Sequence, residues 1–121
     1  IYSQFSPPTL LKNAHIQSIM NSVGPRKFRA KRITKSLNSE QLIISTEAGV
    51  RLTAELDKSN VSHPATKTKP LVILIHGWEG SSQSAYQVTT ASYLLRSGFD
   101  VLRLNLRDHG DSHHLNRELF N

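Results

Sequence analysis

The chain has 121 residues, enough for one domain with a core of its own, and its hydrophobic share of 37% is typical of a globular domain. It contains no cysteine, which excludes disulfides and thiolate chemistry. No apolar run approaches the roughly 18 residues that span a bilayer, and the first residues lack the pattern of a signal peptide. We therefore expect a cytoplasmic protein. Because the first residue is Ile1, we also expect a processed product, a trimmed form or a fragment.

The net charge of +6 is concentrated in one segment. Residues 1–70 carry +7 and residues 71–121 carry −1, and residues 26–35 hold six basic residues in ten. Such a segment can bind nucleic acid or an anionic membrane, or it can be a solvated face or a cover for acidic surface elsewhere. A single aromatic residue, Phe28, interleaves the charges, and no nucleic-acid motif accompanies them. We therefore expect no nucleic-acid partner, and peripheral membrane association stays open.

The first 25 residues predict an arm rather than a core. They contain three prolines and a short amphipathic stretch from Leu11 to Met20, which could form one helical face. A segment with so few apolar residues is expected to pack on the rest of the chain. We therefore divide the chain into an arm, residues 1–25, and a partial domain, residues 26–121.

Residues 31–58 have the composition of β structure. Two apolar stretches, 41–46 and 50–56, are joined by the Gly-containing link 47–49, which is typical of a hairpin. The polar segment 59–70 follows as a loop that ends in proline.

The second half of the chain predicts a strand, a helix and another strand. Residues 71–75 are short, apolar and β-branched, as in a strand covered on both faces. Apolar positions at helical spacing predict a helix over 84–97, which Gly98 ends, and 100–106 form the next strand. Short links between these elements predict a right-handed crossover and a parallel pair. The predicted fold class is α/β, with an antiparallel hairpin followed by a parallel βαβ unit.

Two loops follow the parallel strands and meet at one edge of the sheet. They are HGWEGSS (76–82) and RDHGDS (107–112), and such edges hold the binding sites of open α/β sheets. We expect Gly77 and Gly80 to let backbone N–H groups turn outward at the start of the helix. Those donors would stabilise an anion, such as the oxyanion of an acyl-transfer intermediate. The alternative is a tight turn that binds nothing.

The whole arrangement resembles the N-terminal third of the α/β-hydrolase fold, and more narrowly the YheT-like branch of predicted esterases. Three motifs carry the resemblance in the right order: FSPPTLLKNAHIQSI (5–19), HGWEGSSQSAY (76–86) and NLRDHGDS (105–112). Together they span nearly the whole chain. One departure is Asp108, where many members of the branch carry glycine followed by a small residue or cysteine.

The resemblance implies a role for each residue of the first loop. Trp78 follows His-Gly and would supply the backbone N–H of the oxyanion hole, with its indole beside the acyl group. His76 and Gly77 would shape the turn together with Gly80. Glu79 would brace the loop by hydrogen bonding rather than act as a base.

The resemblance also implies what lies elsewhere. Arg107 and His109 would support the rim of the site. No G-x-S-x-G motif occurs in the chain, so the nucleophilic serine, the acid and the histidine of a triad would all follow residue 121. The implied function is ester hydrolysis by a serine hydrolase, without a cofactor, on small-molecule or lipid esters. The 121-residue chain alone is expected to be inactive.

A crowded stretch of histidines and aspartates near the end of the chain raises the possibility of a metal site. Its members are Asp108, His109, Asp111, His113 and His114. Zinc prefers four tetrahedral ligands, and adjacent histidines on an exposed turn rarely face one ion. We therefore expect no metal.

Two further expectations concern partners. In the resembled fold, residues 71–75 lie between the next strand and a fifth strand that the chain lacks. This edge would therefore pair with the remainder of its own protein or with a second copy. The alternative to an enzyme is a binding module that uses residues 26–35 on nucleic acid or anionic lipid.

Overall fold

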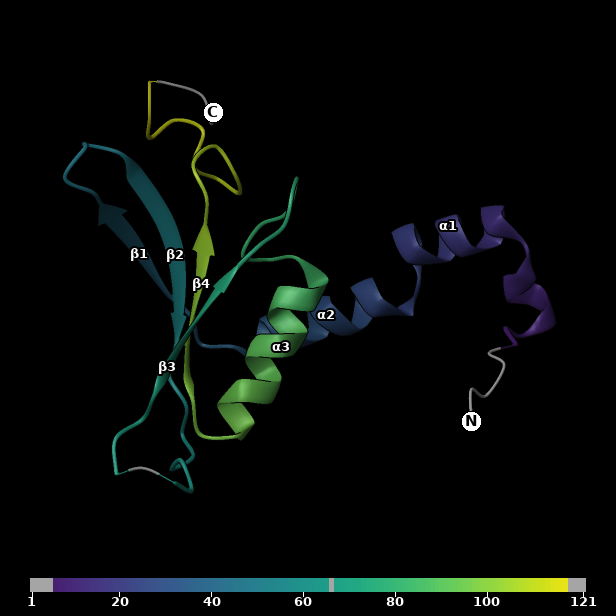
Figure 1. Ribbon diagram of the computed structural model, residues 1–121, viewed down its shortest axis with the longest axis horizontal. Helices are drawn as coiled ribbons and strands as arrows, with labels where there is room; N and C mark the ends of the chain where they lie inside the picture. Colours follow the sequence, from purple (N-terminus) through teal and green to yellow (C-terminus); the bar gives the residue numbers. More distant parts are fainter. Residues whose placement is uncertain (1–5, 66, 118–121) are drawn as a thin grey trace.

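The computed structural model describes residues 6–65 and 67–117. Helices α2 and α3 lie on one side of a sheet, and α1 extends away from it (Figure 1). The elements in chain order are η1 (Thr9–Lys12), α1 (Ala14–Val23), α2 (Pro25–Ser36), β1 (Glu40–Ser45), β2 (Arg51–Asp57), β3 (Leu71–Ile75), α3 (Ala85–Arg96) and β4 (Asp100–Asn105). Within the described ranges, no helix is long and apolar enough to cross a membrane.

The four strands form one mixed sheet in the order β1-β2-β4-β3. β1 pairs with β2, and β2 with β4, in antiparallel fashion, whereas β3 and β4 are parallel. The predicted hairpin and the predicted parallel pair are both present, so the α/β fold class is confirmed. The boundary between an arm and a partial domain at residue 25 stays a prediction.

The basic segment is a helix, so the expectation of β structure from residue 31 was wrong. α2 begins with Pro25 at its first position, where the missing N–H costs no hydrogen bond, and runs to Ser36. Arg, Lys and Ala are good helix formers, and Ala30 is buried where α2 packs against α3. β structure starts only at Glu40.

The third strand has the predicted bounds, but it is not covered on both faces. Leu71, Ile73 and Ile75 are 53%, 56% and 60% exposed, whereas Val72 and Leu74 are partly covered. The register places Ile73 beside Leu102, on the face of β4 that points away from α3. Among the described residues, α3 packs on the opposite face, with α2 on its outer side (Figure 1). This apolar face of the sheet is therefore open.

The core lies between α3 and the sheet. Val88 and Ala91 of α3 and Val101 of β4 have no exposed surface. The helix ends where predicted, since Gly98 adopts a φ of +85° and the backbone N–H of Phe99 donates to the carbonyl of Leu94. This packing fixes the start of α3 directly beside the end of β3.

Candidate functional site

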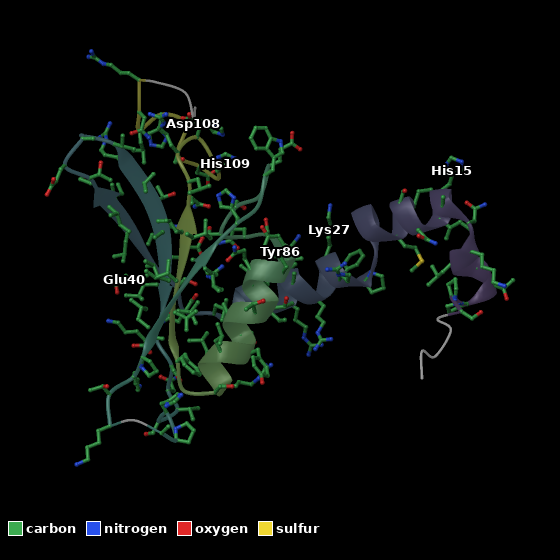
Figure 2. All side chains as sticks on the ribbon, viewed as in Figure 1. His15, Lys27, Glu40, Tyr86, Asp108 and His109 are labelled. Atoms are coloured by element: carbon green, nitrogen blue, oxygen red, sulfur yellow. The ribbon has the colours of Figure 1, made fainter. Side chains whose placement is uncertain are left out.

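The loops that follow β3 and β4 meet at one end of the sheet, as the sequence predicts. The backbone N–H of Leu106 donates to Nε2 of His76 at 3.1 Å. The rings of His76 and His109 lie 4.7 Å apart, centre to centre, and are tilted by 38°. Asp108 and His109 lie at this end of the sheet, and Tyr86 stands at the start of α3 (Figure 2).

His76 is a buried structural link between the two loops. Its Nδ1 lies 2.8 Å from the carbonyl oxygen of Gly77, and its Nε2 accepts from Leu106. The geometry assigns the proton to Nδ1, because Nε2 must offer a lone pair to the Leu106 N–H. A ring that both donates and accepts in this way holds the turn after β3 against the loop after β4.

The backbone N–H groups of Gly77 and Gly80, which were expected to face outward, form hydrogen bonds within the loop and with α3 instead. The N–H of Gly77 donates to the hydroxyl of Tyr86 at 2.7 Å, and the N–H of Gly80 donates to the carbonyl of Gly77 at 2.9 Å. Gly80 is needed for close approach, since a Cβ there would lie 3.0 Å from both the His76 Cβ and the Tyr86 hydroxyl. The outward N–H groups predicted for Gly77 and Gly80 are therefore not available.

Trp78 differs from these neighbours. Its backbone N–H has no hydrogen-bond partner within the described part of the chain, and its side chain is 84% exposed. The N–H of Glu79 likewise has no partner among the described residues, whereas the N–H of Ser81 donates to the hydroxyl of Ser84 at 2.9 Å. The loop therefore presents two adjacent amides without partners among the described residues, those of Trp78 and Glu79, between the bound amides of Gly77 and Gly80.

Glu79 does not brace the loop as expected. Its side chain is exposed and makes no hydrogen bond to any residue that the structure describes. Its contribution lies in the backbone, where a φ of 54° turns the chain back toward Gly80.

The rim after β4 is also a set of internal hydrogen bonds. Nδ1 of His109 lies 2.8 Å from the carbonyl of Arg107, and the hydroxyl of Ser112 donates to the carbonyl of His109. Asp108 has a φ of 61°, a conformation that glycine adopts most easily and that aspartate tolerates. A glycine, as expected at this position from the resemblance, would adopt this φ without strain. Within the described ranges, the side chains of 108–114 do not converge on a metal-binding group of three.

A buried ionic cluster beneath the loop was missed in the sequence. Arg103 of β4 is fully buried, and it donates to Glu55 at 2.7 Å and to Asp57 at 2.9 Å, both on β2. A sequence signal for this cluster does exist. Glu55 and Asp57 alternate along β2, so both side chains point to the same face of the sheet.

The same cluster ties the loop to the sheet. Nη1 of Arg103 donates to the carbonyl of Ser82 at 2.8 Å, and the N–H of Ser82 donates to Oδ1 of Asn105 at 2.7 Å. The hydroxyl of Ser82 also reaches Glu55 at 3.1 Å. The start of α3 is therefore fixed by both main-chain groups of one residue.

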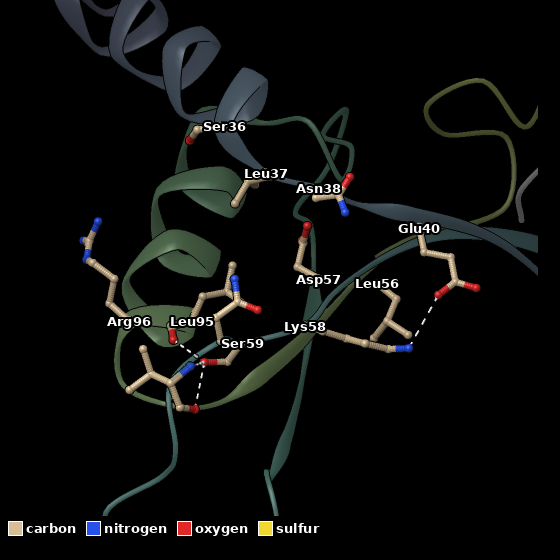
Figure 3. Close-up of a pocket in the computed structure, with 12 residues that line it drawn as sticks. Ser36, Leu37, Asn38, Glu40, Leu56, Asp57, Lys58, Ser59, Leu95 and Arg96 are labelled. Carbon is tan, nitrogen blue, oxygen red and sulfur yellow. Dashed lines mark hydrogen bonds and ion pairs between the residues drawn. The ribbon is translucent and has the colours of Figure 1, made fainter.

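A cavity of about 540 Å³ lies at the opposite end of the sheet (Figure 3). There the hydroxyl of Ser59 donates to the carbonyl of Leu95 at 2.6 Å, and Lys58 pairs with Glu40 across 3.8 Å at the surface. The first contact joins the segment after β2 to the end of α3, and the second joins it to the start of β1. Trp78 is not among the residues that line this cavity.

Comparison with protein families finds a match over the second half of the chain, where the parallel strands and the candidate site lie. Residues 70–120 match the family model of the alpha/beta hydrolase fold. The matched segment includes β3, α3, β4 and both loops at the carboxyl ends of the strands. No match was found among curated proteins. The α/β-hydrolase likeness therefore covers the part of the chain that carries the candidate site.

Proposed function

We propose that the chain is the N-terminal part of a serine hydrolase of the YheT-like branch, acting on carboxylic esters, and that it contributes the oxyanion loop. The observation that carries this proposal is the backbone N–H of Trp78. It lies just after the carboxyl end of β3 and has no partner within the described residues. The match to the alpha/beta hydrolase fold over residues 70–120 supports the same assignment.

The chemistry assigned to the loop is electrostatic. A serine oxygen attacks the ester carbonyl carbon, and the carbonyl electron pair moves to the oxygen, which becomes an oxyanion. The Trp78 N–H would donate to that oxygen, and the nearby start of α3 adds a favourable potential. Since His76, Tyr86 and Arg103 hold the loop through hydrogen bonds, this donor would need little rearrangement during the reaction.

The remaining parts of the site would come from outside this chain. The serine, the acid and the histidine of the triad are expected after residue 121, because the triad follows this loop in the fold. The exposed indole of Trp78 would line the acyl side of the substrate, which suits small-molecule or lipid esters. Arg107 and His109 would support the rim without reacting.

Hydrolysis of p-nitrophenyl esters tests the proposal. The 121-residue chain alone is expected to show no turnover of p-nitrophenyl acetate above a heat-denatured control. The protein continued through a G-x-S-x-G serine is expected to hydrolyse p-nitrophenyl esters, and replacement of that serine by alanine should abolish the activity. A folded continued protein that hydrolyses no ester from acetate to octanoate would contradict the proposal.

The second candidate is a basic binding module. All six cations of residues 26–35 are exposed on α2, and Phe28 beside them is exposed as well. Binding to nucleic acid would fall steeply as salt rises, because each phosphate contact releases counterions. Steep, salt-dependent binding to an oligonucleotide at micromolar affinity, without ester hydrolysis by the continued protein, would favour this candidate.

A further inference from the structure

The two helices on the covered side of the sheet form a groove that is lined by arginines. Three of them face it, Arg26 and Arg29 from α2 and Arg96 from α3, together with the hydroxyl-bearing Thr89 and Ser92. The groove has a volume of about 310 Å³. It lies between α2 and α3, and Trp78 is not among the residues that line it.

No carboxylate is among the residues that line the groove. Neither α2 nor α3 contains an acidic residue. Arg29 and Arg96 form no ion pair with any residue that the structure describes. By contrast, Arg103 is matched by two carboxylates in the core. The like charges of Arg29 and Arg96 therefore repel each other, and an anion between them would relieve that repulsion.

Two polar side chains of the groove, Ser92 and Arg96, carry hydrogen-bond donors that a bound acceptor could use. Nη1 of Arg96 donates to the hydroxyl oxygen of Ser92 at 3.1 Å, so that oxygen serves as an acceptor. The hydroxyl hydrogen of Ser92 has no acceptor among the described residues. Arg96 also borders the cavity of Figure 3, and in that view its side chain extends to the side away from Ser59. Its other guanidinium N–H groups donate to no acceptor among the described residues.

We propose that the groove between α2 and α3 binds a phosphate group, either free in solution or in a lipid headgroup. Arginine presents a planar fork of N–H donors that fits the oxygens of phosphate in pairs, and charge-assisted bonds of this kind are the stronger ones. Arg29 and Arg96 line the groove from different helices, and Ser92 beside Arg96 adds a hydroxyl donor. This site is independent of ester hydrolysis.

The proposal is specific to the groove rather than to the charge of α2 as a whole. Four other cations of this helix, Lys27, Lys31, Arg32 and Lys35, do not line it. They attract any anion weakly and without a fixed geometry. Arg32 is therefore a matched control for Arg29, with the same residue type, the same helix and the same change of charge.

The test is titration of the 121-residue chain with inorganic phosphate and with glycerol 3-phosphate, followed by amide NMR shifts. Arg29→Gln and Arg96→Gln are each expected to weaken binding about tenfold, the loss of one charge-assisted contact, whereas Arg32→Gln should change it less than about twofold. Thermal unfolding by circular dichroism identifies a variant that fails to fold. Arg29→Lys and Arg96→Lys, which keep the charge but lose the fork, should then show an intermediate loss.

Vesicles distinguish the two sources of phosphate. Cosedimentation with phosphatidic acid vesicles but not with phosphatidylcholine vesicles, lost in Arg29→Gln and Arg96→Gln, identifies a lipid headgroup. Phosphate binding without cosedimentation identifies a free phosphate. The proposal is overturned if Arg32→Gln weakens binding as much as the groove variants do. It is also overturned if the chain binds neither phosphate nor vesicles, or if it binds only an oligonucleotide and all three variants weaken that binding equally.

Discussion

Arg103 and Asp57 form a buried ion pair between neighbouring antiparallel strands. Nε of Arg103 donates to Oδ2 of Asp57 at 2.9 Å, and the guanidinium has no exposed surface. The hydroxyl of Ser39 joins the pair, since it donates to Oδ1 of Asp57 at 2.5 Å and accepts from Nη2 of Arg103 at 2.8 Å. The pair is thus part of a closed network that also includes Glu55.

Arg103→Met is expected to destabilise the fold by about 3–5 kcal/mol, because it leaves two carboxylates buried without a cation. Urea unfolding followed by circular dichroism measures this change. Lys58→Ala removes the exposed partner of Glu40 and should cost no more than about 1 kcal/mol. A triple replacement of Arg103, Glu55 and Asp57 by uncharged residues of similar size should recover most of the loss. Unchanged stability of Arg103→Met would contradict the prediction.

Trp78→Pro and Trp78→Ala separate the backbone from the side chain at the proposed oxyanion donor. Proline removes the N–H, so in the protein continued through its nucleophilic serine we expect a loss of about 3 kcal/mol in transition-state stabilisation, seen in kcat. Alanine keeps the N–H and should change the preference for acyl length more than kcat. Steady-state kinetics on acetate and octanoate esters measure both effects. Equal losses of kcat in the two variants would mean that the backbone role is wrong.

Gly98→Ala is expected to cost about 3 kcal/mol, since strain at a φ of +85° adds to a steric clash. An added Cβ there would lie 2.7 Å from the backbone N and Cα of His63. Gly49 also has a positive φ, of 76°, but a Cβ there meets nothing within 4 Å. Gly49→Ala should therefore cost about 1 kcal/mol. Thermal unfolding of both variants gives the difference, and equal costs would show that the contact with His63 is not tight.

Ile73→Lys tests the proposed pairing of β3 with a second copy or with the rest of its own protein. β3 is an outer strand, and its exposed face is apolar, so we expect the 121-residue chain to associate in solution. A lysine at Ile73 places a charge on that face and should shift the chain toward monomer. Ile43→Lys is the control, since Ile43 is 63% exposed on the other outer strand and on the opposite face of the sheet. Sedimentation velocity at several concentrations measures the effect, and a monodisperse wild-type monomer at high concentration would refute the pairing.

The sequence by itself predicted the elements whose signals are local. The apolar run from Leu71 to Ile75 predicted a strand, and the helical spacing before Gly98 predicted a helix and its end. The Gly-containing link after residue 46 predicted a turn. Such features depend on backbone preferences and periodicity within about ten residues of one another. The convergence of two loops at one end of the sheet followed from the parallel pair, because parallel strands share their carboxyl ends.

The tertiary structure decided which groups have partners. Arg103 meets Asp57 and Glu55 only because β4 pairs with β2, and that contact joins residues more than 40 positions apart. The amides of Gly77 and Gly80 were expected outside, but the hydroxyl of Tyr86 and the turn itself use them, which leaves the amides of Trp78 and Glu79 without partners among the described residues. Residues 31–36 continue a helix that Pro25 and several good helix formers favour locally, but its partner α3, which covers Ala30, is a contact that no local pattern encodes. Periodicity within a segment fixes which side chains share a face, whereas the hydrogen bonds and ion pairs of that face depend on segments that only folding brings together.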